Sequence, residues 1–119
     1  MKEHQEIFAS AARTATSSAT TSCKSTQGLF FINVTAVTGA PSVVFTIAGV
    51  APNGSVAYTV LASAAITATG LVVLRVSPHL TAAANTIAED LLPSALKVTA
   101  THANADSITY SMHFVGTDE

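Results

Sequence analysis

Apolar residues recur at every second position in two neighbouring stretches within residues 28–50. This period of two is typical of β-strands, because successive side chains of a strand point to opposite faces. The residues on the predicted inner faces are Phe30, Ile32 and Val34 in the first stretch and Val43, Phe45 and Ile47 in the second. Residues 38–42 contain a Gly and a Pro, so we predict that a short loop joins the two strands as a hairpin. A hairpin alone is at best marginally stable in water, and further strands must therefore cover its apolar face.

The same alternation predicts further strands towards the C-terminus, at residues 56–62, 71–76, 95–101 and 108–114. The Pro and Asn-Gly pair within residues 51–55 predict a turn before the first of them, because Asn and Gly tolerate positive φ. Residues 79–93 have only weak helical character, and we expect an ordered crossover loop there. About six or seven strands separated by turns predict an all-β fold, an antiparallel β-sandwich that is Ig-like or jelly-roll-like.

The first 26 residues have a different composition from the rest of the chain. Residues 9–26 are nearly all Ala, Ser and Thr, and such a stretch buries too little apolar area to order itself. We therefore divide the chain into an N-terminal arm, residues 1–26, and a β-sandwich domain, residues 27–119. Within the arm we expect an edge strand at residues 7–14 and a loose segment at residues 17–26, held by a neighbouring subunit.

Charged residues are scarce in this chain. They make up 10% of it, against roughly 25% in ordinary soluble domains. The net charge is −2 and there is no basic run, so we expect no direct contact with nucleic acid. No apolar run reaches the roughly 18 residues of a membrane-spanning helix, and no signal peptide is evident, so we expect no membrane partner. The charge deficit favours a chain that works against other protein subunits, with an Ala-rich monomer as the alternative.

Catalytic and metal-binding patterns are missing from the sequence. The spacing of the histidines along the chain does not match that of metal ligands. The four histidines are His4, His79, His102 and His113. Glu89 and Asp90 are adjacent, and neighbouring side chains on an extended or turning backbone point apart rather than forming an acid–base pair. No serine lies in a G-x-S-x-G motif. We therefore predict no enzyme, no catalytic residue, no metal ion and no cofactor.

Five segments of the chain carry a resemblance to a known family. In order along the chain they read FASAARTAT, GLFFINVTAVTGAPSVVFTIAG, YTVLASAAITATG, LTAAANT and DLLPSALKVTATHANADSITYS. Together they cover nearly the whole chain and are similar to a family of short structural proteins of tailed bacteriophages. The resemblance implies a component of the virion.

Within that class we expect a capsid decoration (cement) protein on the capsid surface, assembled in the host cytoplasm. Its partners would be the major capsid protein and further copies of itself in a homo-oligomer, for which a trimer would suit a three-fold position. A small, charge-poor β domain can bury apolar strand faces between capsid subunits and lend an edge strand to a neighbouring sheet. The candidate partner-binding residues are Ile7, Phe8, Arg13 and His79.

Three other functions would suit the same composition. A tail, head–tail connector or baseplate component differs from a decoration protein in its copy number per particle. A host-surface or glycan-binding module needs exposed aromatic residues, for which Tyr58 and Tyr110 are the candidates. An enzyme needs at least two of the following side chains to converge in one pocket: His79, His102, His113, Glu89 and Asp90.

Overall fold

The computed structural model describes residues 2–51 and 57–117, which form two β-sheets packed face to face. No helix occurs in these ranges, and the predicted antiparallel β-sandwich is confirmed. The strands are β1 (Lys2–Arg13), β2 (Ser17–Ser22), β3 (Gln27–Val37), β4 (Val43–Val50), β5 (Ala57–Ala62), β6 (Gly70–Val76), β7 (Ile87–Ala88), β8 (Ala95–His102) and β9 (Ile108–Thr117). The Pro and Asn-Gly turn predicted before β5 falls largely on residues 52–56, outside the described residues.

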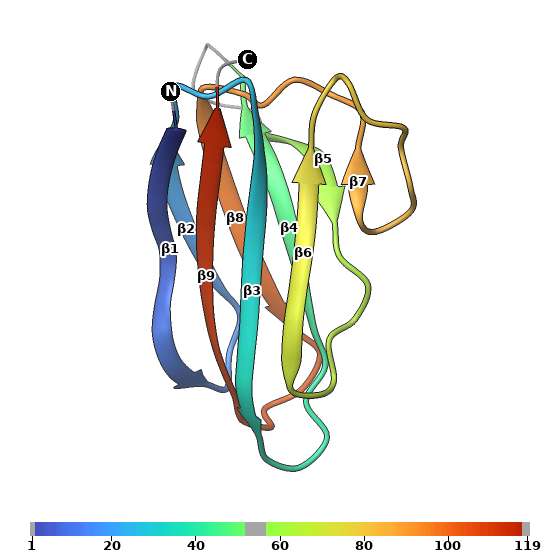
Figure 1. The fold of residues 1–119 in the computed structure, drawn as a ribbon. Helices are drawn as coiled ribbons and strands as arrows, with labels where there is room; N and C mark the ends of the chain where they lie inside the picture. The colour runs from blue at the N-terminus through green and yellow to red at the C-terminus, as the bar shows by residue number, and fades with distance from the viewer. Residues whose placement is uncertain (1, 52–56, 118–119) are drawn as a thin grey trace.

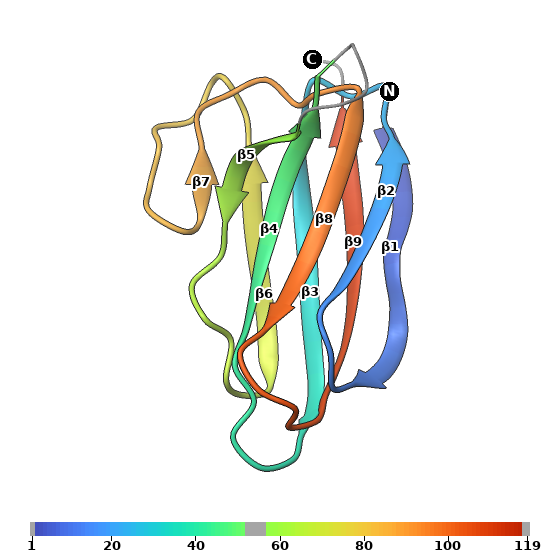
Figure 2. The same cartoon turned by 180° about the vertical axis from the view of Figure 1, so that it is seen from behind.

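Each sheet has a simple strand order. Sheet A has the order β1-β9-β3-β6-β7 and faces the viewer in Figure 1. Sheet B has the order β2-β8-β4-β5 and faces the viewer in Figure 2. All neighbouring strands are antiparallel except β6 and β7, which run parallel.

The strand order identifies the topology as a jelly roll. From the chain ends inwards, β1 pairs with β9, β2 with β8, β3 with β6, and β4 with β5. The chain therefore folds as one long antiparallel ribbon, and this ribbon wraps so that β9 also pairs with β3 and β8 with β4. Eight strands wound in this way into two sheets form a jelly roll, to which the two-residue strand β7 is an addition.

The hairpin predicted within residues 28–50 is wrong, although both of its strands exist. β3 belongs to sheet A and β4 to sheet B, so residues 38–42 cross from one sheet to the other. The predicted inner residues of both strands are buried, with at most 2% of any side chain exposed. Alternation identifies the buried face of each strand but not the sheet that contains it, because both inner faces cover the same core.

The core is built around aromatic side chains. The ring of Tyr110 packs edge-on against Phe45 at 4.9 Å and against Phe8 at 5.8 Å between ring centroids. At the other end of the core the ring of Phe114 lies over two glycines, Gly28 and Gly116, which face each other across β3 and β9. A Cβ atom on either glycine would come within 2.4 Å of the Phe114 ring, so only glycine leaves room for that ring.

The expected loose segment at residues 17–26 is also wrong in part. Ser17–Ser22 form β2, which pairs along its whole length with β8, and Cys23 is buried. Backbone hydrogen bonds order this strand even though Ser and Thr provide little apolar area. The expected edge strand at residues 7–14 is present in a longer form as β1, at the edge of sheet A. Residues 2–26 thus supply a strand to each sheet of the sandwich.

Candidate functional site

The outer face of sheet A carries a continuous apolar surface. Its five members on β3, β6 and β9, hereafter the apolar stripe, are Leu29, Phe31, Leu71, Val73 and Val115. The pairing register places Leu29 beside Val115, and Phe31 beside Val73. Leu71 is 61% exposed and the other members are half-buried against one another. No segment of the described chain lies in front of β9 and β3 in Figure 1.

The outer face of sheet B is more polar than that of sheet A. Its residues include Ser18, Thr20, Thr46, Lys97, Thr99 and Thr101. An antiparallel sheet commonly has one face on the core and a polar face towards water, and sheet B follows this rule. Sheet A departs from the rule, because apolar side chains occupy both of its faces. A contiguous apolar patch on a protein surface typically marks a contact with another protein.

Charged side chains border the apolar stripe on opposite sides. On β6 the exposed side chain of Arg75 follows Val73 on the same face and forms no ion pair within the described residues. On the other side, β1 presents Glu6, whose carboxylate lies 3.4 Å from Nε2 of His113 on β9. Both of these side chains are about half exposed, at 57% and 47%. The face therefore runs from a cation, across apolar residues, to a carboxylate.

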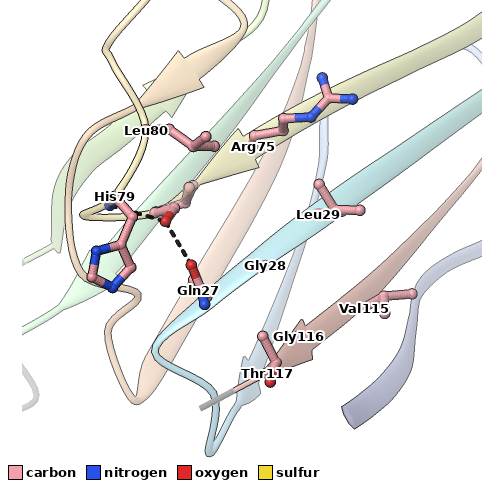
Figure 3. A pocket seen from close by; sticks show the side chains of 11 residues that line it. Gln27, Gly28, Leu29, Arg75, His79, Leu80, Val115, Gly116 and Thr117 are labelled. Atoms are coloured by element: carbon pink, nitrogen blue, oxygen red, sulfur yellow. Dashed lines mark hydrogen bonds between the residues drawn. The ribbon is translucent and has the colours of Figure 1, made fainter. Parts of the chain in front are cut away.

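A groove of about 330 Å³ lies at one end of the apolar stripe. Leu29 and Val115 line it from the sheet, and His79 and Leu80 line it from the loop after β6 (Figure 3). The Oγ atom of Ser77 donates a hydrogen bond of 2.6 Å to Gln27 and accepts one of 3.1 Å from the backbone N–H of His79. These bonds fix the start of the loop against β3. Among the described residues, none that lines the groove is acidic.

Two of the four predicted partner-binding residues make contacts within the chain. Phe8 is only 6% exposed and packs in the aromatic core. The guanidinium group of Arg13 donates hydrogen bonds to the carbonyl oxygens of Ala9 at 2.7 Å, Ala11 at 3.2 Å and Tyr110 at 3.0 Å. Because β1 is irregular in this region, its carbonyl groups need such partners, and Arg13 stabilises the edge of the sheet.

The other two predicted residues occupy different surroundings. Ile7 is half-buried and packs against the core, whereas His79 is exposed beside the groove. Of the four candidates, only His79 thus lies at the end of the apolar stripe. The apolar stripe itself was not predicted as a site. Its signal in the sequence is residues 71–74, which contain no polar residue. A strand with one solvated face would instead alternate apolar and polar residues.

The side chains that an enzyme would need lie in separate places. His79 borders the groove, His113 lies on the outer face of sheet A, and His102 ends β8. Glu89 and Asp90 line a second, open groove beside β5 that contains no histidine. Within residues 2–51 and 57–117, no three His, Cys, Asp or Glu side chains are grouped closely enough to hold a metal ion.

His102 has a ring that is shielded from solvent. Its two ring nitrogens are shielded from solvent and have no hydrogen-bond partner within the described residues. Burial, together with the nearby positive charge of Arg13, lowers the pKa of His102 below its ordinary value. Its ring lies 6.2 Å from that of Tyr110 in the core. This arrangement favours a neutral imidazole that contributes to packing.

Comparison of the chain with protein-family models, with curated proteins and with solved structures finds no match. The part of the chain that the structure describes also contains no helix suited to crossing a membrane. Function must therefore be inferred from the fold and its surface, where the apolar stripe and its charged borders are the most distinctive features.

Proposed function

We propose that this protein is a non-enzymatic bacteriophage virion component, a capsid decoration protein that stabilises the head by binding across major capsid protein subunits. The observation that carries the proposal is the apolar stripe on the outer face of sheet A. Nothing in the described chain covers these side chains, and contact with protein removes them from water. A chain with 10% charged residues has few charged side chains to offset such exposure.

The fold and the sequence resemblance agree with this proposal. Jelly rolls recur in viral capsid domains, although they also occur in lectins and cupins. The resemblance to short structural proteins of tailed phages favours the first of these settings. A decoration protein occupies many equivalent positions on a symmetric shell, so a modest contact at each position adds up to a large stabilisation of the whole.

A glycan-binding module has one supporting observation. Tyr58 is 47% exposed, as an aromatic platform for a sugar ring would require. Tyr110, the other aromatic candidate, is fully buried and cannot contact a ligand without unfolding. A single exposed tyrosine is weaker support than the apolar stripe, and the decoration role remains our proposal.

Quantification of this chain in purified virions tests the proposal. We expect a copy number that matches the capsid subunits, and lower thermal stability of particles assembled without the protein. Copies confined to one vertex or to the tail would instead indicate a connector, tail or baseplate component. Absence of the chain from mature particles would contradict every virion role. Binding of the free protein to immobilised glycans, lost in Tyr58→Ala, would support the glycan-binding module.

A further inference from the structure

We infer that the groove at the end of the apolar stripe receives a segment of the major capsid protein in which a large apolar side chain stands next to a carboxylate. This inference rests on the proposed decoration role and names the chemistry of the partner at that site. Three features of the groove carry it: its apolar walls, the cationic and imidazole groups around it, and its continuity with the stripe.

The walls of the groove suit an apolar anchor. Leu29 and Val115 lie side by side on β3 and β9, and Leu80 lines the groove from the loop after β6 (Figure 3). The volume of about 330 Å³ is at the lower end of the roughly 300–1,000 Å³ of ligand pockets. Such a space accepts one or two side chains, and the residues that anchor protein interfaces characteristically fill pockets of this kind.

The polar groups around the groove favour a negative charge. Arg75 lies beside Leu29 in the pairing register, and its exposed side chain has no ion pair within the described residues. His79 lines the groove from the loop, and His4 lies beside Val115 on β1; both histidines are exposed. A guanidinium group binds a carboxylate through two parallel hydrogen bonds, and an imidazole can donate a hydrogen bond in either protonation state.

The carboxylates of the described chain are engaged elsewhere. On the outer face of sheet A, Glu6 lies one level along from the groove, with its carboxylate 3.4 Å from Nε2 of His113. Glu89 and Asp90 line the separate groove beside β5. Glu3 and Asp106 accept hydrogen bonds from backbone N–H groups in other parts of the molecule. A carboxylate for Arg75 must therefore come from a partner.

The groove is continuous with the surface that the proposed function assigns to the capsid. Leu29 and Val115 belong to both the groove and the stripe, and Phe31 follows at the next level of the sheet. A capsid surface that covers the stripe therefore also covers the mouth of the groove. An anchor held there, with its carboxylate on Arg75, fixes the orientation of the molecule on the shell, because charge complementarity sets the register of an interface.

Matched charge reversals on the two faces of the sandwich test the inference. Particles assembled without the protein are mixed with wild type, Arg75→Glu or Lys97→Glu, and bound protein is measured over a concentration series. We expect Arg75→Glu to weaken binding about tenfold or more, because like charges then meet. Lys97→Glu, at an exposed position on the outer face of sheet B, should bind as wild type does. Equal weakening by both changes would indicate general charge attraction and would overturn the inference.

Blocking the groove tests the apolar anchor. Val115→Trp places a large side chain in the groove, and Val44→Trp makes the same change at a half-buried position on the outer face of sheet B. We expect Val115→Trp to abolish binding to the particles and Val44→Trp to retain it, with circular dichroism as the check that both variants fold. A folded Val115→Trp that binds normally would contradict the inference, and if this variant fails to fold, the comparison at Arg75 decides.

Overlapping synthetic peptides of the major capsid protein identify the occupant. We expect the peptides that bind wild type to share a large apolar residue beside Asp or Glu. Replacing this acidic residue with Lys should abolish binding to wild type and restore binding to Arg75→Glu. Binding confined to peptides without a carboxylate, or no binding by any peptide, would overturn the inference.

The inference and the proposed function can fail separately. If particles bind wild type, Arg75→Glu and Val115→Trp equally well, the decoration role is supported and the groove is excluded as its anchor. If the chain is absent from virions and does not bind particles, the decoration role fails. Selection of apolar–acidic peptides from a random library by wild type, but not by Arg75→Glu, would then still establish the specificity of the groove.

Discussion

At the scale of single residues, the least expected feature is the internal use of Arg13. From the sequence this residue suggests a surface contact, because a lone cation in an Ala-rich segment has no evident partner. In the structure its guanidinium group lies 4.6 Å from the centroid of the Tyr110 ring while it donates to three backbone carbonyls. Arginine suits this position because its planar group combines several donors with a face that stacks on an aromatic ring.

Replacement of Arg13 should therefore destabilise the isolated protein. Arg13→Ala leaves the carbonyl groups of Ala9 and Ala11 without this donor, and we expect a loss of about 1–3 kcal/mol in the free energy of unfolding. Arg13→Lys should recover only part of the loss, because an ammonium group lacks the planar fork. Denaturant unfolding measures the effect, with Lys97→Ala on sheet B as the exposed control. Equal stabilities of wild type and Arg13→Ala would contradict this role.

His102 should make the fold sensitive to mild acid. Its pKa is lowered in the folded state, so the unfolded chain binds more protons as the pH falls through the ordinary histidine value of 6.5. Stability contributed by the neutral imidazole is thus complete above this pH and decreases below it, until the folded-state pKa is passed.

The variant His102→Phe tests this dependence. Phenylalanine keeps an aromatic ring but cannot bind a proton, so the decrease in melting temperature between pH 8 and pH 5 should become smaller (both pH values bracket the roughly 6.5 of a free histidine). His79→Gln, at an exposed position, should show the same decrease in melting temperature as the wild type. If His102→Phe also showed the wild-type decrease, the acid sensitivity would come from another group.

At the scale of elements, alternation located most of the strands and their buried faces. All inner residues of the last strand, from Ile108 to Phe114, are buried as predicted. β2 was missed because Ser, Thr and Ala give no apolar signal, and its order comes from pairing with β8. The assignment of β3 and β4 to different sheets was missed because a short loop suits a hairpin and a crossover equally well.

The edges of the two sheets are joined by side chains of β1. Glu3 accepts hydrogen bonds from the Ser25 hydroxyl at 2.8 Å and from the backbone N–H of Lys24 at 3.0 Å. Gln5 donates to the carbonyl oxygen of Ser22 at 2.7 Å and accepts from the Thr21 hydroxyl. Burial opposes ionisation of Glu3, but the hydrogen bonds outweigh this effect and lower its pKa.

Removal of the Glu3 carboxylate should loosen this junction between the sheets. We expect Glu3→Ala to lower the free energy of unfolding by about 1–2 kcal/mol near neutral pH, because three donors, on Lys24, Ser25 and Gln5, lose a charged acceptor. Because the pKa of Glu3 is lowered, its contribution is present above the ordinary value of 4.5 and is lost as the pH falls through the folded-state pKa. Wild type and variant should therefore converge in stability at low pH. A difference that persists in strong acid would contradict this account.

At the scale of the whole molecule, the jelly roll joins the two ends of the chain. β1 pairs with β9 from Lys2 opposite Thr117 to Arg13 opposite Ile108, so the first strand cannot form before the last. A sequence taken segment by segment suggests a detachable arm, because the pairing partner of β1 lies about a hundred residues away. The apolar stripe likewise depends on register between strands far apart in sequence, so the apolar run at residues 71–74 indicates only the part of the stripe on β6.

Deletion of residues 2–13 should therefore prevent folding rather than trim a tail. It removes Phe8 from the core and leaves β9, which still pairs with β3, as the exposed edge strand of sheet A. We expect loss of the cooperative thermal transition and aggregation of the truncated chain, measured by circular dichroism and light scattering. In the full-length protein, residues 2–22 should resist limited proteolysis even without a partner. Rapid cleavage there in the free protein would show that β1 and β2 are ordered only after assembly.

The pairing of Lys2 with Thr117 also places the two ends of the described chain side by side at one pole of the molecule (Figure 1). The loop at residues 38–42 lies at the opposite pole (Figure 1). A short Gly-Ser linker could therefore connect Thr117 to Lys2 while new ends are opened in that loop, since neighbouring surface termini favour circular permutation. Foreign peptides attached at Lys2 or at Thr117 would emerge from the same pole, and those inserted at residues 38–42 would emerge from the other. The fold thus provides two attachment sites about one molecular length apart for labels or displayed antigens.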